Sequence, residues 1–546
     1  MMYRFIFTIA LASSTTSTIL AQSGSASIEY REIAFTGQQA AGVSGDASYT
    51  SFSHPRISQN GHISFLGGIF GNDADPASTA VFAMHNDGTT RLVAREGERS
   101  PTGAFWRRLS NAYISSAGEV ALAGQIGLGR YPSGVDSIWS EGGGGGLRPI
   151  AIEGRPTPDR RGDEVFGALP TEFRFNNAGD IAFASSTFGT KVPGTVAPSL
   201  WSESGGEGLR RVITRYDVSP GIDGLIYSMK APALNDLGEM VFPASLTSFG
   251  TGDPRDVIYR ESHELGMQPV VHDFQYLPDY DVTLSSLYSD AAVAINNRGD
   301  AIFTADIRTS PSGRPDDALW IQTHDSGLEL IARRGDLVPG FEFQFGDFDL
   351  PLISANGHIA FHSGLIGAGI GSPNGSSIWL SDDSGSLRLV AQEGVTPAGT
   401  TGQVEFDEFD DINTSFEMSI NAHGQIAFLA DLRGNDVTSQ NDLGLWATDL
   451  AGSLHLIART GDLFDVNPDP AIEDLREIKS IEFHGGSGGE DGYGVTLNDR
   501  GELVMKLQFV GSEPTFGLYV VSIPEPGTVA AASIALLTAR RRRLDA

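Results

Sequence analysis

Two short stretches of the sequence place carboxylates and aromatic rings in close alternation. They are Phe341-Glu-Phe-Gln-Phe-Gly-Asp-Phe-Asp349 and Glu405-Phe-Asp-Glu-Phe-Asp-Asp411. Successive side chains of a strand point to opposite faces, so the carboxylates would share one face and the phenylalanines the other. Clustered carboxylates can hold Ca²⁺ or contact a cationic partner. The predicted binding residues are Asp347, Asp349, Glu405, Asp407 and Asp410. The alternative interpretation is a half-buried strand with a solvated acidic face.

A third acidic stretch, Asp465-Val-Asn-Pro-Asp469, has the D-x-N-x-D opening of a calcium-binding loop. Such a loop then needs a glycine and, at its end, a glutamate that binds the ion through both oxygens. Pro470 and Arg476 occupy those two places. Asp465, Asn467 and Asp469 are therefore weak metal-ligand candidates. Apart from this weak indication of calcium, the sequence predicts no cofactor.

Residue patterns for catalysis are absent from the sequence. It has no cysteine, which excludes disulfides, thiolate zinc sites and cysteine nucleophiles. It has no HExxH or phosphate-binding motif either. Carboxylate pairs that cleave polysaccharides come from distant segments and leave no local spacing. We therefore predict no catalytic residue and favour a protein that is not an enzyme.

The chain of 546 residues carries a formal net charge of −31. This charge argues against nucleic acid as a partner, because phosphate binding needs a basic surface. The length exceeds what one hydrophobic core normally holds, so several domains or a repeat array are expected.

A short phrase recurs eight times and is clearest in Ile295-Asn-Asn-Arg-Gly-Asp-Ala-Ile-Phe303. Its central glycines, 57 to 77 residues apart, are Gly61, Gly118, Gly179, Gly238, Gly299, Gly357, Gly424 and Gly501. Asn or Ser stands three residues before each glycine, and Phe, Leu122 or Met505 stands four residues after it. An Asn or Ser side chain that bonds nearby backbone, followed by Gly with positive φ, predicts a hairpin corner.

An aromatic residue follows each central glycine by 18 to 22 residues. These aromatics are Phe82, Trp139, Trp201, Tyr259, Trp320, Trp379, Trp446 and Tyr519. We interpret them as repeated core residues of a third strand. A fourth strand closes each unit, as in Leu92-Val-Ala-Arg-Glu-Gly97.

Four strands in about sixty residues predict one blade of a β-propeller, with an open solenoid as the competing arrangement. The last unit lacks its fourth strand, and Arg31–Gly37 near the N-terminus aligns with Arg91–Gly97. A strand shared between the two ends of the chain would close a ring and leave no free edge. We predict one all-β domain over residues 28–523, an eight-bladed propeller, with seven blades as the alternative.

Both ends of the chain have the features of targeting signals. Residues 1–21 have the charged start, apolar run and small-residue cleavage site of a secretory signal. At the other end, over residues 524–546, a Pro-Glu-Pro triplet precedes a short apolar segment and four arginines. The signal residues there are Pro524, Glu525, Pro526, Arg540, Arg541, Arg542 and Arg543. Twelve apolar residues span only about 18 Å, so membrane association through this tail should be transient.

The C-terminal tail resembles the PEP-CTERM sorting signal, and the repeat resembles the NxxGxxAF tandem repeat of bacterial surface proteins. The repeat departs from that pattern at Ser58, Ser115, Ser354, Leu122 and Met505. These resemblances imply recognition by an exosortase and export to the outer surface or extracellular matrix of a Gram-negative bacterium. They imply no catalytic residues.

The sequence therefore predicts an exported, monomeric propeller that binds extracellular polysaccharide or a surface protein through its variable loops. The alternative function is a polysaccharide hydrolase or lyase with carboxylates at the mouth of the central channel.

Overall fold

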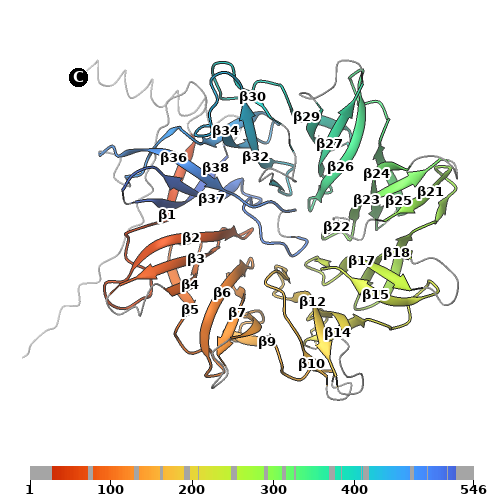
Figure 1. Ribbon diagram of the computed structural model, residues 1–546, viewed down its shortest axis with the longest axis horizontal. Helices are drawn as coiled ribbons and strands as arrows, with labels where there is room; N and C mark the ends of the chain where they lie inside the picture. The colour runs from red at the N-terminus through yellow and green to blue at the C-terminus, as the bar shows by residue number, and fades with distance from the viewer. Residues whose placement is uncertain are drawn as a thin grey trace, which may run out of the picture.

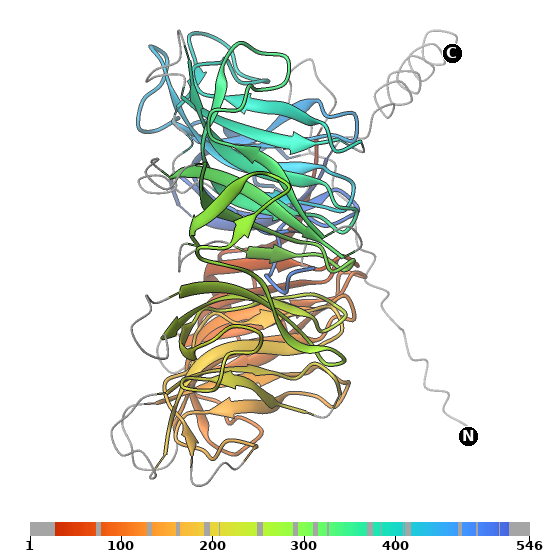
Figure 2. The same cartoon turned by 90° about the vertical axis from the view of Figure 1, so that its right-hand side faces the viewer.

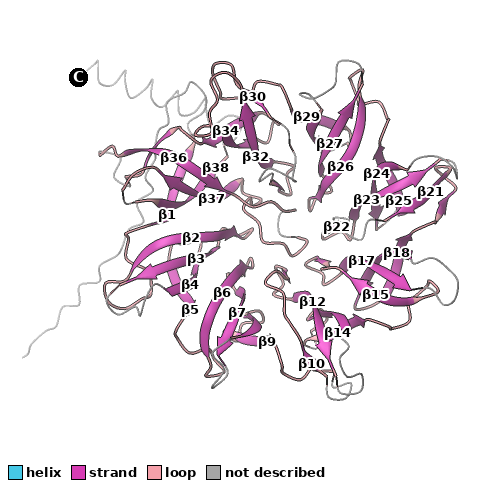
Figure 3. Ribbon diagram, in the orientation of Figure 1, coloured by secondary structure: helices cyan, strands magenta, loops and turns pink. Residues whose placement is uncertain are grey.

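Eight antiparallel sheets stand around a central axis in the computed structural model (Figure 1). The structure describes residues 28–71, 78–127, 134–159, 164–189, 197–206, 208–247, 255–287, 293–309, 315–324, 327–367, 375–382, 384–407, 409, 417–467, 472–487, 490–512 and 514–523. Over these residues the regular elements are all strands (Figure 3). The predicted eight-bladed propeller is confirmed, and the seven-bladed alternative is wrong.

Each blade is numbered from its inner strand, which faces the axis, to its outer strand. Blades 1 and 2 are β2 (Ser48–Ile57), β3 (Ile63–Phe70), β4 (Ser78–Met84) and β5 (Thr90–Arg95), then β6 (Phe105–Ile114), β7 (Val120–Gly127), β8 (Val135–Ser140) and β9 (Arg148–Ile152). Blade 3 is β10 (Val165–Phe166) with β11 (Arg174–Phe175), β12 (Ile181–Phe188), β13 (Ala197–Ser202) and β14 (Arg210–Thr214). Blade 4 is β15 (Leu225–Met229) with β16 (Ala233–Leu234), β17 (Met240–Thr247), β18 (Arg255–Ser262) and β19 (Gly266–His272).

Blade 5 is β20 (Tyr276–Leu277) with β21 (Val282–Ser286) and β22 (Val293–Ile295), β23 (Ala301–Arg308), β24 (Asp316–Thr323) and β25 (Gly327–Arg333). Blade 6 is β26 (Gln344–Ile353), β27 (Ile359–Ile366), β28 (Ser376–Ser381) and β29 (Leu387–Gln392). Blade 7 is β30 (Glu405–Phe406) with β31 (Met418–Ile420), β32 (Ile426–Arg433), β33 (Leu443–Thr448) and β34 (Leu454–Arg459). Blade 8 is β35 (Leu463–Asp465) with β36 (Leu475–Glu482), β37 (Glu502–Phe509), β38 (Phe516–Ser522) and β1 (Glu29–Phe35). Seen from the side, these sheets cross the thickness of the disc (Figure 2).

The ring is closed by strands from the two ends of the chain. β1 is the outer strand of blade 8 and pairs antiparallel with β38, with Arg31 opposite Val520. Tyr30 adds a hydrogen bond of 2.6 Å from its hydroxyl to the Ile457 carbonyl in blade 7. The prediction that an N-terminal strand completes the last blade is confirmed.

The repeated aromatic residues form the cores of the blades. All eight lie in third strands and are at most 1 % exposed. Each stands directly opposite the residue four places after a central glycine, as in Phe65 opposite Phe82 and Phe428 opposite Trp446. The two recurring features of the sequence are therefore the two sides of one cross-strand pair, which stabilises a sheet by contact across the ladder.

The recurring phrase forms a corner between the inner strand and the second strand of each blade. At the corner of blade 4, the Asn235 carbonyl accepts the Gly238 N–H at 3.0 Å, and Gly238 has φ +79°. The Asn235 amide oxygen accepts the N–H groups of Leu237 and Glu239, at 3.1 and 2.8 Å. The predicted hairpin corner is confirmed.

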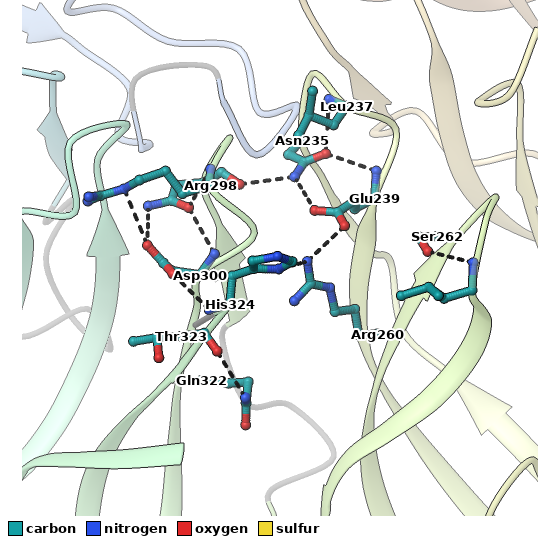
Figure 4. A network of polar contacts seen from close by, with 12 residues as sticks. Asn235, Leu237, Glu239, Arg260, Ser262, Arg298, Asp300, Gln322, Thr323 and His324 are labelled. Carbon is teal, nitrogen blue, oxygen red and sulfur yellow. Dashed lines mark hydrogen bonds and ion pairs between the residues drawn. The ribbon is translucent and has the colours of Figure 1, made fainter. Parts of the chain in front are cut away.

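The same asparagines also connect neighbouring blades. The Asn235 amide nitrogen donates to the Asn296 carbonyl of blade 5 at 3.0 Å, beside a network in which Arg260 pairs with Glu239 (Figure 4). Asn176, Asn296, Asn421 and Asn498 donate in the same way to the next corner, the last of them back to Ser58 of blade 1. We call this set of linked turns the corner ring. Turn chemistry alone does not explain the asparagines, because their amide nitrogens hold the blades together.

A second recurring position lies where each outer strand leads to the next blade. The residue there donates its N–H to the following inner strand, as Gly97 does to Trp106 and Gly335 to Phe345. Six of the eight blades have glycine here with φ between +75° and +88°: Gly37, Gly97, Gly154, Gly335, Gly394 and Gly461. The other two have Tyr216 and Phe274, with φ +69° and +64°. A left-handed conformation costs a residue with a side chain about 1–2 kcal/mol.

The last unit differs from the others in one connection. Residues 462–494 do not form a single long loop between the outer strand and the next inner strand. That region contains β35 and the inner strand β36, and the extra residues are 483–497, between β36 and the corner at Asn498.

Candidate functional site

Residues 483–487 and 490–497 leave blade 8 and enter the centre of the ring, where Figure 1 shows them in blue. We call them the axial segment. Its carbonyls accept backbone N–H groups from other blades: Val495 from Ile57, Gly492 from Phe175, Asp491 from Leu234 and Gly486 from Ile420, at 2.8 to 3.0 Å. The inner strands have no further neighbour toward the axis, so the axial segment satisfies donors that would otherwise face the channel.

Glycines allow this segment to approach the channel wall. A Cβ on Gly494 would lie 2.7 Å from the Tyr113 ring and 2.8 Å from the Arg56 side chain. A Cβ on Gly485 would lie 2.4 Å from the Met418 carbonyl. At both positions a side chain would displace the segment from its contacts with the wall.

A cavity of about 310 Å³ lies between the axial segment and the inner ends of several blades. Its charged and aromatic lining residues are Arg56, Tyr113, Glu172, Arg174, Glu417, His484, Asp491 and Tyr493. Solvent reaches this space, since Tyr493 is 38 % exposed. We call it the axial cavity.

Two arginines supply positive charge to the axial cavity. Arg174 is 4 % exposed, and its guanidinium carbon lies 3.3 Å from the centre of the Tyr493 ring. Its Nε and the Nε and Nη1 of Arg56 are buried and have no hydrogen-bond partner among the described residues. Burial also lowers the pKa of Arg56.

Two carboxylates around the cavity have hydrogen-bond partners in the axial segment. Glu417 accepts the Gly485 N–H through Oε2 at 2.7 Å, and Asp491 accepts the Tyr493 N–H through Oδ1 at 3.1 Å. Both therefore hold the axial segment in place. Burial raises the pKa of Asp491 to about 6. Burial, with Asp499 and Asp236 nearby, raises that of its neighbour Glu490 to about 8.

A histidine pair stands at the start of the axial segment. The rings of His54 and His484 are stacked with centroids 5.7 Å apart. Glu482 accepts the His54 N–H at 3.1 Å and pairs with Lys506. Burial raises the pKa of Glu482, but its contacts with His484, Lys506 and the His54 N–H outweigh burial and hold that pKa down at about 2. This corner of the cavity is therefore charged, with its anion already neutralised.

The binding residues predicted from sequence lie elsewhere. In β26, Phe345 and Phe348 are buried, whereas the side chains of Asp347 and Asp349 are 70 % and 57 % exposed. The ion-pair partners are Arg334 for Asp347, His362 for Asp349, and Arg433 for Glu405 and Asp407. Asp410 lies outside the described residues, and none of the other four lines the axial cavity.

The remaining predicted residues give no site either. Asp465 accepts the N–H groups of Asn467 and Asp474, each at 3.0 Å, as in a local turn. Asp469, residues 1–21 and the sorting residues from Pro524 to Arg543 lie outside the described residues. Within the described ranges, no group of three or more His, Asp or Glu side chains is arranged to hold a metal. The described part of the chain also has no helix able to span a membrane.

The sequence did contain a signal for the cavity residues. Arg56, Tyr113 and Arg174 each stand two places before the Asn or Ser of a corner. The other blades have Ala233, Ala294, Leu352, Ser419 and Thr496 at that place. Large polar side chains at this channel-facing register occur only in blades 1 to 3, and a comparison of repeats by position would have shown them.

Comparisons with known proteins identify the family. The model of a family of unknown function, DUF7453, matches residues 4–106 and 100–530. The chain belongs to this family. A search of curated proteins finds no match in sequence.

A search of solved structures finds matches of low TM-score to this DUF7453 protein. The Dos1 propeller has a TM-score of 0.35 and 10 % identity, over 88 % of this chain and 94 % of its own. The polysaccharide lyase Uly1 has a TM-score of 0.30 and 10 % identity, over 89 % and 92 %. An acylaminoacyl peptidase of Pyrococcus horikoshii has a TM-score of 0.36 and 12 % identity over 75 % of this chain, which spans 52 % of that enzyme.

Proposed function

We propose that this protein is an exported binding module whose axial cavity receives the carboxylate end of an acidic glycan. The observation that carries the proposal is the pair of guanidinium groups with buried, unpartnered nitrogens, Arg56 and Arg174. A buried donor without an acceptor is costly, so ligand oxygens here would recover that free energy. Arginine also presents paired N–H groups that match a carboxylate.

The size and lining of the cavity support a small group rather than the middle of a polymer. Its volume of about 310 Å³ is at the low end for ligand pockets. Tyr493 and Tyr113 offer ring surface beside the arginines, which suits the apolar face of a sugar. We therefore expect a terminal sugar acid to enter.

Export and surface location belong to the same proposal. They are supported by the secretory signal in residues 1–21 and by the PEP-CTERM-like tail in residues 524–546, which an exosortase would recognise. Such a protein would meet extracellular polysaccharide, and its tail would hold it at the membrane only transiently.

The test is calorimetric titration of the folded protein with oligogalacturonate. Wild type should bind, and Arg174→Gln should weaken binding about tenfold or more, because it removes a charged donor. Arg56→Gln should act in the same direction. Arg334→Gln, which alters an exposed pair on blade 6, is the matched control and should bind as wild type does. Absence of binding by wild type, or equal loss in the control, would contradict the proposal.

A polysaccharide hydrolase or lyase is the second candidate, because Glu172, Glu417 and Asp491 share the cavity with His484 and Tyr113. Two of these carboxylates already accept backbone N–H groups of the axial segment. Binding is therefore favoured over cleavage. Release of reducing or unsaturated ends from polygalacturonate by wild type, abolished in Glu172→Gln, would reverse this order.

A further inference from the structure

Two aromatic residues replace glycine at the same register of neighbouring blades. Tyr216 donates its N–H to Ile226 and Phe274 to Leu284, the bonds that glycines make in the other six blades. Both keep the left-handed conformation that glycine adopts there, with φ +69° and +64°. Strained residues of this kind persist where their side chains are used.

Core packing does not account for these side chains, because each is 54 % exposed. Tyr227 follows Ile226, which accepts the Tyr216 N–H, and is 48 % exposed. Tyr276, two residues after Phe274, is 56 % exposed. The Arg215 guanidinium lies 4.9 Å from the centre of the Tyr216 ring and 4.3 Å from that of Tyr227, so it holds these two rings as one group. We call Tyr216, Tyr227, Phe274 and Tyr276 the aromatic platform.

The repeat places both halves of the platform on one face of the disc, one blade apart. Tyr216 and Phe274 each connect an outer strand to the next inner strand. The loop after Tyr216 also touches the outer strand of blade 4, since a Cβ on Gly221 would lie 3.0 Å from Pro269 in β19. The strand that contains Pro269 leads directly to Phe274. An extended ligand on this face would pass from one half of the platform to the other.

We propose that the aromatic platform binds a neutral polysaccharide chain, at a site separate from the axial cavity. Sugar rings present C–H faces that suit exposed aromatic rings and hydroxyls that donate to carboxylates. Exposed Asp223, Asp279 and Asp281 supply acceptors around the rings. These carboxylates and the net charge of −31 disfavour an anionic polymer. Besides the rings, the exposed apolar residues of these loops are Val218 and Pro278, which are too few for the apolar centre of a protein interface.

Substitution of both aromatic residues by glycine removes the rings without disturbing the backbone conformation. The variant Tyr216→Gly with Phe274→Gly restores the glycine found in the other blades, so it should fold as well as wild type or better. The probes are hydroxyethyl cellulose, galactomannan, xylan and dextran in native affinity gels, with polygalacturonate as the anionic polymer. At least one neutral polymer should retard wild type, and the double variant should bind it about tenfold more weakly for each ring lost.

Leu463→Ala, which removes a side chain 65 % exposed on blade 8, is the control and should be retarded as wild type is. Thermal melts of all three proteins confirm folding. Retardation by none of the neutral polymers, or retardation unchanged in the double variant, overturns the proposal. Because Arg56 and Arg174 are untouched, oligogalacturonate binding should persist in the double variant, which separates this test from that of the proposed function.

Discussion

The corner ring and the axial cavity lie a few residues apart along the same strands, yet their polar groups are in opposite states. In the ring, the Asn235 oxygen is used by its own turn and its nitrogen by the next blade. In the cavity, Arg56 and Arg174 keep buried nitrogens that have no hydrogen-bond partner in the described part of the chain. The polar residues that recur at the corners use their hydrogen-bonding groups to build the fold. Those that appear at one register in only some blades retain capacity for a ligand.

At two corners with serine, another residue supplies the hydrogen bond that links the blades. Ser58 and Ser354 cap their own turns through their hydroxyls but are too short to reach the next blade. Asn60 and Asn356, two places later, donate to the next corner in their stead, each at 2.8 Å. The link between blades is thus kept even where the repeat residue is lost.

The largest expected effect comes from Asn235, which is fully buried. Asn235→Ala removes the cap of its turn and the bond to blade 5, and should lower the free energy of unfolding by about 3 kcal/mol. Asn235→Ser keeps a capping hydroxyl, as Ser58 does, and should cost about half as much. Urea denaturation measures both. Equal losses would show that the turn alone, and not the ring, explains the asparagine.

The axial segment makes an intermediate prediction through Glu490, whose pKa of about 8 lies above its ordinary value of 4.5. Below about pH 4.5 the carboxyl is protonated in both states and costs nothing. As the pH rises toward 8 the unfolded chain loses its proton first, so stability falls across this window. Glu490→Gln should therefore gain about 2 kcal/mol near pH 9 and nearly nothing near pH 4.5. A pH-independent gain in denaturant titrations would remove the carboxyl as the cause.

The smallest effect separates the aromatic platform from the regular blades. Tyr216→Gly relieves a left-handed residue and should raise the free energy of unfolding by about 1 kcal/mol. The opposite change at the matching place, Gly335→Tyr, should lower it by a similar amount. Thermal melts of the pair test whether the two positions are equivalent. A loss of stability in Tyr216→Gly would mean that its ring contributes to packing.

The architecture could be predicted from the sequence because its signals are local and repeated eight times. A corner needs a glycine with positive φ, and a core aromatic must face its cross-strand partner. Gly238 and Tyr259 therefore indicate a turn and a buried strand from their own place in the repeat. The candidate site could not be predicted in this way. The axial segment has no counterpart in other blades, and Arg174 meets Tyr493 across more than three hundred residues of chain. The density of carboxylates in the acidic stretches suggested a binding site. In the structure, however, Asp347 and Asp407 form ion pairs with arginines of the same or the adjoining blade.

Closure of the ring by β1 and β38 also bears on how the chain folds. Arg31 in β1 pairs with Val520 in β38. The hydrogen bonds of β1 therefore cannot form until β38, near the other end of the chain, is available. The entropy of closing so long a loop grows only slowly with length, but pairing between such distant strands is slow. Until then the partly built ring presents open strand edges at both ends, and its encounters with other chains compete with completion. Refolding yield should therefore fall as protein concentration rises, even where the finished ring is stable.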